Sequence, residues 1–126
     1  MADSKGLFTI TDRTAEFEKE DAQQNKVMGI LAYIGILVLV PIFAAKDSKF
    51  ARFHANQGLV LAIFEVASYL IFSVILSMIP KIGWLFGVIG WIISVGLVVL
   101  AVLGIVAAAR GQAKELPIVG QIKILK

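Results

Sequence analysis

The chain of 126 residues contains no cysteine. Disulfide frameworks, thiolate zinc sites, iron–sulfur ligation and cysteine nucleophiles are therefore excluded. The sequence also lacks a phosphate-cradling glycine-rich loop, an HExxH zinc motif and a GxSxG nucleophile elbow, and it has a single histidine. We therefore expect a protein that is not an enzyme and that has no metal, no cofactor and no catalytic residue.

Charged residues are also scarce, at 17% of the chain against about 25% in soluble domains. They are almost absent from three apolar segments, residues 27–45, 58–80 and 82–109, in which Glu65 is the single charge. About 20 apolar residues in a helix cross the hydrocarbon core of a membrane. The sequence therefore predicts an all-α integral membrane protein with three transmembrane helices. This membrane domain covers residues 22–110, between a polar N-terminal tail (1–21) and a basic C-terminal tail (111–126).

The connection between the first two expected spans combines phenylalanine with basic and polar side chains. Asp47 or Ser48 can cap a helix there, so we expect a short interfacial helix. Its candidate functional residues are Arg52, His54, Asn56 and Gln57. They belong either to a wet interfacial turn in contact with membrane lipid or to a surface that docks a partner protein. Because the basic residues are few and lie beside a span, anionic lipid is a better partner for them than nucleic acid.

Two residues inside the apolar segments are unusual for a membrane span. Pro41 should kink the first helix and leave the Leu37 carbonyl without its usual donor. Glu65 lies about 10 Å inside the second span, where an ionised carboxylate is costly. We therefore expect Glu65 to be protonated and to hydrogen-bond to the Leu37 carbonyl or to Ser68 or Tyr69. The alternatives are an ion or proton pathway through Glu65 and a tolerated acid near the interface.

The third expected span carries small residues at helical spacing along one side. They are Gly83, Gly87, Gly90, Ser94, Ala101, Gly104 and Ala108. Small residues let helix backbones approach closely in lipid. The stripe, with Gly87 and Gly90 as its candidate packing residues, either packs against the other spans of the same chain or forms a seam in a homo-oligomer.

Targeting and orientation follow from the charges outside the spans. The first 26 residues contain no apolar run of signal-peptide length and are too acidic for a transit peptide, so we expect a prokaryotic cell membrane. With three spans, the first loop and the C-terminal tail share one side and carry seven Lys and Arg residues, against four on the other side. The positive-inside rule then predicts that the first loop and the C-terminal tail are cytoplasmic and the N-terminal tail is outside.

Two stretches carry a family resemblance, Asp47–Gly58 (DSKFARFHANQG) and Gly111–Ile118 (GQAKELPI). They resemble a widespread bacterial family of small three-span membrane proteins, over about residues 21–126. That family is similar to the twenty-kilodalton subunit of the chloroplast inner-envelope import translocon (Tic) and to magnetosome membrane proteins of the MamF type. The first similarity implies a part in a protein-conducting or assembly complex, and the second implies membrane organisation. Neither implies an enzyme.

The expected function is therefore that of a non-catalytic membrane protein acting through helix–helix association with itself or with other membrane proteins. It would be a translocon-like or membrane-organising component. The alternative is an oligomeric pore or carrier for a small ion or solute, with Glu65 on its pathway.

Overall fold

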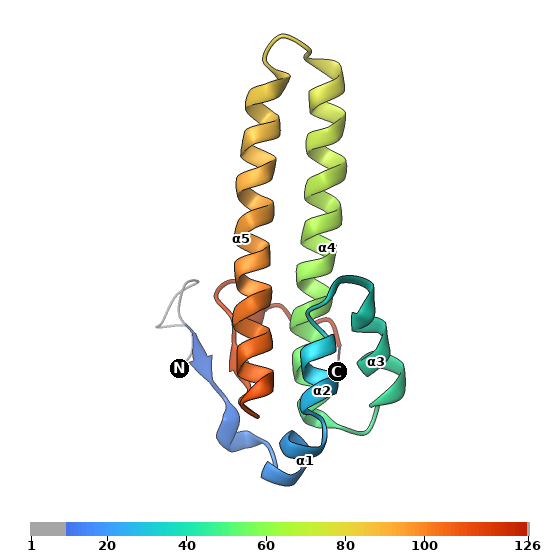
Figure 1. Ribbon diagram of the computed structural model, residues 1–126, viewed down its shortest axis with the longest axis vertical. Helices are drawn as coiled ribbons and strands as arrows, with labels where there is room; N and C mark the ends of the chain where they lie inside the picture. The colour runs from blue at the N-terminus through green and yellow to red at the C-terminus, as the bar shows by residue number, and fades with distance from the viewer. Residues whose placement is uncertain (1–9, 126) are drawn as a thin grey trace.

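The computed structural model describes residues 10–125, and two long antiparallel helices, α4 (Lys49–Met78) and α5 (Gly83–Ala109), dominate it (Figure 1). The other elements gather around the end of this hairpin at which α4 begins and α5 ends, which we call the base. In chain order they are β1 (Thr11–Asp12), the 3-10 helix η2 (Thr14–Glu16), α1 (Lys19–Gln24), α2 (Lys26–Leu31), the 3-10 helix η3 (Gly35–Val38), α3 (Leu39–Ala44), β2 (Lys114–Glu115) and the 3-10 helix η4 (Val119–Gln121).

Local sequence signals determine where the two long helices begin and end. Ser48 caps α4, because its Oγ accepts the Ala51 N–H at 3.0 Å. The helix ends at Met78, shortly before a proline that has no N–H to continue the ladder. After α5, Gly111 adopts φ +70° and the next N–H reaches back to the Ala107 carbonyl at 2.8 Å. This is the usual way in which glycine terminates a helix.

Away from the base, α4 and α5 expose apolar side chains. Trp84 and Trp91 are 66% and 68% exposed. The apolar part of α4, residues 58–78, is about 31 Å long at 1.5 Å per residue, which matches a hydrocarbon core of about 30 Å. Both helices are long and apolar enough to cross a membrane. An apolar surface of this extent suits contact with lipid rather than water.

The first apolar segment does not form the expected transmembrane helix. Residues 27–45 form α2, η3 and α3 instead, and the chain turns back so that α3 leads to the base again (Figure 1). The reversal includes Gly35, whose φ of +52° lies in the left-handed region that glycine adopts without a Cβ penalty. The described residues thus contain two helices of spanning length and one pair of short helices that folds back, and the three-span prediction is not confirmed for the first segment.

Three further expectations about this part of the chain need correction. Pro41 kinks no helix, because it is the third residue of α3, in the first turn, where N–H groups have no intrahelical partner in any case. The Leu37 carbonyl is not left without a donor, since it accepts the Leu39 N–H. The expected interfacial helix is not a separate element either. It forms the first turns of α4, which run on without a break into the apolar part.

The N- and C-terminal tails meet at the base. Strands β1 and β2 are antiparallel, with Thr11 opposite Glu115 and Asp12 opposite Lys114. Arg13 Nε strengthens this pairing by donating to Glu115 Oε2 at 2.6 Å. The all-α prediction missed this pair of strands. Paired strands lie on the same side of any bilayer, so the expected placement of the two tails on opposite sides is not confirmed.

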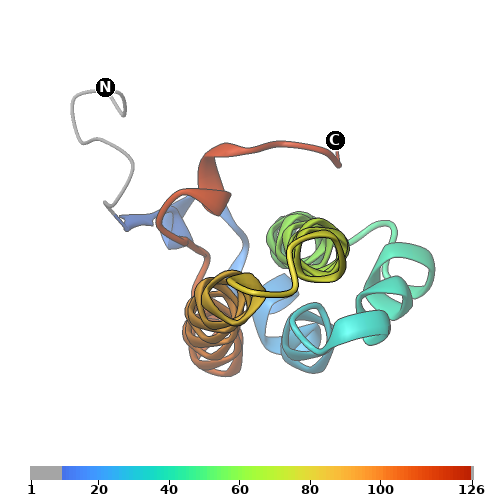
Figure 2. The ribbon, with the colours of Figure 1, turned by 90° about the horizontal axis from the view of Figure 1, so that it is seen from above.

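The buried core lies at the base, around the first turns of α4. Figure 2 shows α2 and α3 on one side of α4 and the C-terminal segment on the other. Phe50, Ala55 and Val60 of α4 are buried together with Leu116 and Val119 of the C-terminal segment. The polar side chains of α4 that lie between these apolar residues are buried as well. They form the first of the two sites described next.

Candidate functional site

A buried polar cluster at the base is built from Tyr33, His54 and Gln57. His54 Nε2 donates to the Gln112 carbonyl at 2.8 Å, because a carbonyl oxygen can only accept. The other ring nitrogen, Nδ1, is then the acceptor, and it receives the Tyr33 hydroxyl at 2.6 Å. The Tyr33 oxygen accepts in turn from Gln57 Nε2 at 2.7 Å. His54 is fully buried, so its expected position in a wet interfacial turn was wrong.

The polar residues of this part of α4 bind the C-terminal segment. Gln57 Oε1 accepts the Leu116 N–H at 2.6 Å. Asn56 Nδ2 donates to the Ile122 carbonyl at 2.7 Å, and its Oδ1 accepts the Ile124 N–H at 2.6 Å. Side chains that the sequence offers for lipid or partner contact therefore serve to hold the tail against the base.

Sequence reasoning missed Tyr33, although a signal was present. Tyr33 is the one polar side chain of the apolar segment 27–45, and a hydroxyl in such a segment needs a partner. The partners His54 and Gln57 are three residues apart on α4, so both turn toward the same side. The C-terminal carbonyls that complete the cluster carry no side-chain signal at all.

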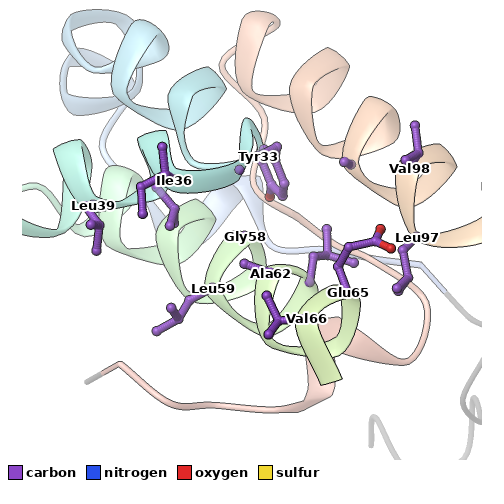
Figure 3. Close-up of a pocket in the computed structure, with 14 residues that line it drawn as sticks. Tyr33, Ile36, Leu39, Gly58, Leu59, Ala62, Glu65, Val66, Leu97 and Val98 are labelled. Atoms are coloured by element: carbon purple, nitrogen blue, oxygen red, sulfur yellow. The ribbon is translucent and has the colours of Figure 1, made fainter. Parts of the chain in front are cut away.

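A second candidate site lies farther along the hairpin, where two cavities share Glu65. The cavity nearer the base has a volume of about 510 Å³, and α4, α5 and the segment around η3 line it (Figure 3). The other cavity, of about 290 Å³, lies between the outer parts of α4 and α5. The lining positions on α5 are 87, 90, 91 and 94 for the outer cavity and 97, 98 and 101 for the inner one. This helical spacing places both cavities along one face of α5.

Glu65 has a hydrogen-bond partner on the neighbouring helix. Its side chain extends from α4 toward α5 (Figure 3), and Ser94 Oγ donates to Glu65 Oε1 at 2.5 Å. This partner is none of those expected from the sequence, and the Leu37 carbonyl in particular has its own donor. Ser94 is the one hydroxyl side chain of residues 82–109, which is a signal that could have pointed to it.

The two candidate packing glycines of α5, Gly87 and Gly90, have different surroundings in the structure. A Cβ atom at Gly90 would lie 3.2 Å from the Phe72 ring, so Gly90 packs against α4 within the chain. A Cβ atom at Gly87 would meet nothing beyond its own helix within 4 Å, and Gly87 lines the outer cavity. The small-residue stripe thus has one part filled by this chain and one part open.

The remaining candidate, Arg52, lines a third cavity at the base, on the face of α4 opposite to the inner cavity. His54 and Glu65 are eleven residues apart, about 16 Å along the helix, so the buried cluster and the intramembrane carboxyl are separate sites. Among residues 10–125, no three His, Asp or Glu side chains lie close enough together to hold a metal ion.

Residues 24–125 match the model of the magnetosome magnetite crystal formation protein family, MamF/MmsF. The chain belongs to this family. It is 39% identical to magnetosome protein MamF of Paramagnetospirillum magneticum, over 77% of this chain and 80% of that protein. It is 32% identical to magnetosome protein MmsF of the same organism, over 79% of this chain and 85% of that protein.

The MamF/MmsF similarity extends to archaeal membrane proteins. The UPF0132 membrane protein MJ1527 of Methanocaldococcus jannaschii is 28% identical over 75% of this chain and 64% of that protein. No solved structure matches the chain. The resemblance to MamF-type proteins is confirmed and the chain is a membrane protein of this family, but the comparisons do not show the expected similarity to the chloroplast import translocon.

Proposed function

We propose that this protein is a non-catalytic membrane protein that associates with further copies of itself in the bilayer and thereby organises the membrane around it. The observation that carries the proposal is the outer cavity beside Gly87. Gly87 lines this cavity and has no other element within 4 Å of an added Cβ atom. Hydroxyl side chains of α4 and α5 line it too, among them Ser68, Ser73 and Ser94. In lipid, helices associate through small residues that allow close approach and through hydrogen bonds between polar side chains.

The membrane setting is a prokaryotic cell membrane with the base on the cytoplasmic side. Of the Lys and Arg residues that the structure describes, Lys81 alone lies in the far loop. The others lie at the base: Arg13, Lys19, Lys26, Lys46, Lys49, Arg52, Arg110, Lys114 and Lys123. Cytoplasmic segments of membrane proteins carry such an excess of positive charge. With two crossings, both tails then lie in the cytoplasm.

The relatives support a role at a membrane rather than in the conversion of a substrate. Those from Paramagnetospirillum magneticum are named for the magnetosome, and the family is named for magnetite crystal formation. The archaeal relative is named only as a membrane protein. Organisation of a membrane by self-association is a function that all of these could share.

Two glycines of α5 allow a matched test. A Cβ atom at Gly87 or at Gly96 would have nothing beyond its own helix within 4 Å, so a larger side chain can begin at either position without a clash at Cβ. Gly87 lines the outer cavity, whereas Gly96 lies half a turn away from that face. Oligomer size in liposomes is measured by Förster transfer between labelled copies. We expect Gly87→Leu to disperse the oligomer and Gly96→Leu to leave it intact; an unchanged oligomer in both variants would refute the proposal.

A second candidate function, a pathway for a small ion or solute, is favoured by one observation. Glu65 lines both cavities, so it is placed where they meet. Glu65→Gln keeps an acceptor for Ser94 but cannot ionise. If the protein conducts, purified wild type in liposomes shows ion or solute flux and Glu65→Gln loses it. Absence of flux in the wild type, with the oligomer present, leaves the organising function as the one supported.

A further inference from the structure

The third cavity, of about 400 Å³, lies at the base and is formed by three segments far apart in the sequence. The first turns of α4 supply Lys49, Arg52, Phe53 and Asn56, the segment before α1 supplies Phe17, and the C-terminal segment supplies Lys123 and Leu125. The α4 residues have the spacing i, i+3, i+4 and i+7, which places them on one face of the helix. The cavity is therefore formed by the tertiary packing of three segments and not by a single loop.

Positive charge dominates the cavity. Of the seven lining residues that belong to the described part of the chain, three are basic and none is acidic. Lys123 Nζ is held by Glu115 Oε2 at 2.7 Å, but that carboxylate also binds Arg13 Nε at 2.6 Å, so one negative charge serves two cations. The nearby carboxylate of Asp21 is occupied by Ser48 Oγ and the Phe50 N–H. The cavity therefore favours an anionic ligand.

The floor of the cavity is apolar. The rings of Phe17 and Phe53 meet edge to face with centroids 5.3 Å apart, and Lys123 Nζ lies 5.8 Å from the Phe53 centroid. The Asn56 side chain hydrogen-bonds to the backbone of the C-terminal segment, where its Oδ1 also accepts the Leu125 N–H at 2.9 Å. Asn56 is thus a positioning residue that holds the wall carrying Lys123 and Leu125 against α4.

The location matches a membrane surface. The lining residues of α4 end at Asn56, and the apolar part of the helix begins two residues later. A ligand in the cavity would therefore have its polar part at the headgroup level and its apolar part beside the hydrocarbon core.

We infer that this cavity binds the phosphate group of an anionic phospholipid, with Lys49, Arg52 and Lys123 around the phosphate and the glycerol end of the acyl chains against Phe17 and Phe53. The inference depends on the membrane placement proposed above but not on self-association. Basic side chains near the headgroups attract anionic lipid, and arginine pairs with phosphate through two parallel hydrogen bonds.

The test uses the full chain in nanodiscs of phosphatidylcholine with a fraction of phosphatidylglycerol, and native mass spectrometry counts the phosphatidylglycerol retained after release into detergent. The double variant Lys49→Gln/Arg52→Gln is compared with Lys19→Gln/Lys46→Gln, which removes two positive charges from exposed residues of the base outside the cavity. We expect retention to fall on the order of tenfold in the first variant and to stay near wild type in the second. Thermal unfolding verifies that both variants are folded.

Equal retention in the two double variants, or no preference for phosphatidylglycerol in the wild type, would overturn the inference. Inorganic phosphate and glycerophosphoglycerol are added as soluble competitors. Displacement of the lipid by inorganic phosphate at millimolar concentration would show a site for free phosphate and would also overturn it. Gly87→Leu is expected to retain lipid normally, so failure of the self-association proposal and failure of the lipid site are told apart in the same preparation.

Discussion

At the scale of single residues, the Tyr33 hydroxyl is the centre of the buried cluster at the base. It donates to His54 and accepts from Gln57, and within the described residues no buried side-chain polar atom is without a partner. Tyr33→Phe removes both bonds, which leaves the buried His54 Nδ1 without its donor and Gln57 Nε2 with only the Lys114 carbonyl as an acceptor. We expect the free energy of unfolding to fall by about 1–3 kcal/mol.

Denaturant unfolding in one detergent measures this change, and Tyr69→Phe is its control. Tyr69 is 71% exposed, so loss of its hydroxyl should leave stability almost unchanged. If both variants unfolded at the same denaturant concentration as the wild type, the buried hydrogen bonds would not be holding the base together.

A second residue-scale prediction concerns Asp21, which fastens α1 to the start of α4. Its carboxylate accepts Ser48 Oγ at 2.5 Å and the Phe50 N–H at 3.0 Å. Burial by itself raises the pKa of Asp21, but the hydrogen bonds from Ser48, Phe50 and Asn25 together lower the pKa below its ordinary value of 3.8. The ionised form of Asp21 is therefore the one that stabilises the fold.

The direction of the pH dependence follows. Because the pKa of Asp21 is lower in the folded than in the unfolded chain, its contribution is present above about pH 4 and is lost as the pH falls through the folded pKa. We expect Asp21→Asn to be less stable than the wild type at pH 7 and to lose less stability on acidification. Thermal unfolding at several pH values compares the two chains, and parallel curves would contradict this prediction.

At the scale of elements, the contact of α2 with α4 depends on Gly58. A Cβ atom at this position would overlap the Ala32 carbonyl oxygen. Since backbone cannot move aside as a flexible side chain can, we expect Gly58→Ala to separate the two helices and to lower stability by about 1–3 kcal/mol or more. Gly96→Ala is the control, because its added methyl group meets no other element. The same unfolding midpoint for both variants would contradict a close approach at Gly58.

The elements also mark how far the sequence could predict the fold. The spans predicted over residues 58–80 and 82–109 correspond to the apolar part of α4 and to α5, whereas the first turns of α4 were expected as a separate helix. Residues 27–45 are equally apolar, but hydropathy measures composition and does not report conformation. The same segment contains Gly35, which takes a left-handed conformation, and a proline that suits the first turn of a new helix. Short helices packed against a hairpin also satisfy their backbone hydrogen bonds, so the run can fold back instead of crossing.

For the candidate site, the sequence predicts the residues that need partners better than it predicts the partners. Glu65 stands out as a lone acid in an apolar run, and His54 and Gln57 stand out beside one. Ser94 becomes the partner of Glu65 only through the relative rotation and register of α4 and α5. Gln112 and Leu116 join the base through backbone atoms, which every residue type has in common.

At the scale of the whole molecule, the polar and charged residues lie mainly at the base, and the apolar surface lies on the outer parts of α4 and α5. The tails, the start of α4 and the end of α5 lie together at the base (Figure 1). In the proposed two-crossing topology the chain returns to the side on which it began, because the short helices α2 and α3 fold back to the base and add no further crossing. With this topology the difference in positive charge between the two ends is much larger than in a three-span arrangement, and it supports the orientation proposed above.

This topology gives the last prediction, for which the absence of native cysteine is convenient. Single cysteines replace Glu18, Lys81 and Gln121, which are all exposed. In intact cells we expect a membrane-impermeant maleimide to label Lys81→Cys alone, with Glu18→Cys and Gln121→Cys labelled only after lysis. A three-span arrangement would instead give opposite results for Glu18→Cys and Gln121→Cys. The double variant Asp12→Cys/Lys114→Cys adds a direct readout, because these positions are paired between β1 and β2 and should form a disulfide when isolated membranes are oxidised. Failure of that cross-link, together with opposite labelling of the two tails, would exclude the shared base on which the two-crossing topology depends.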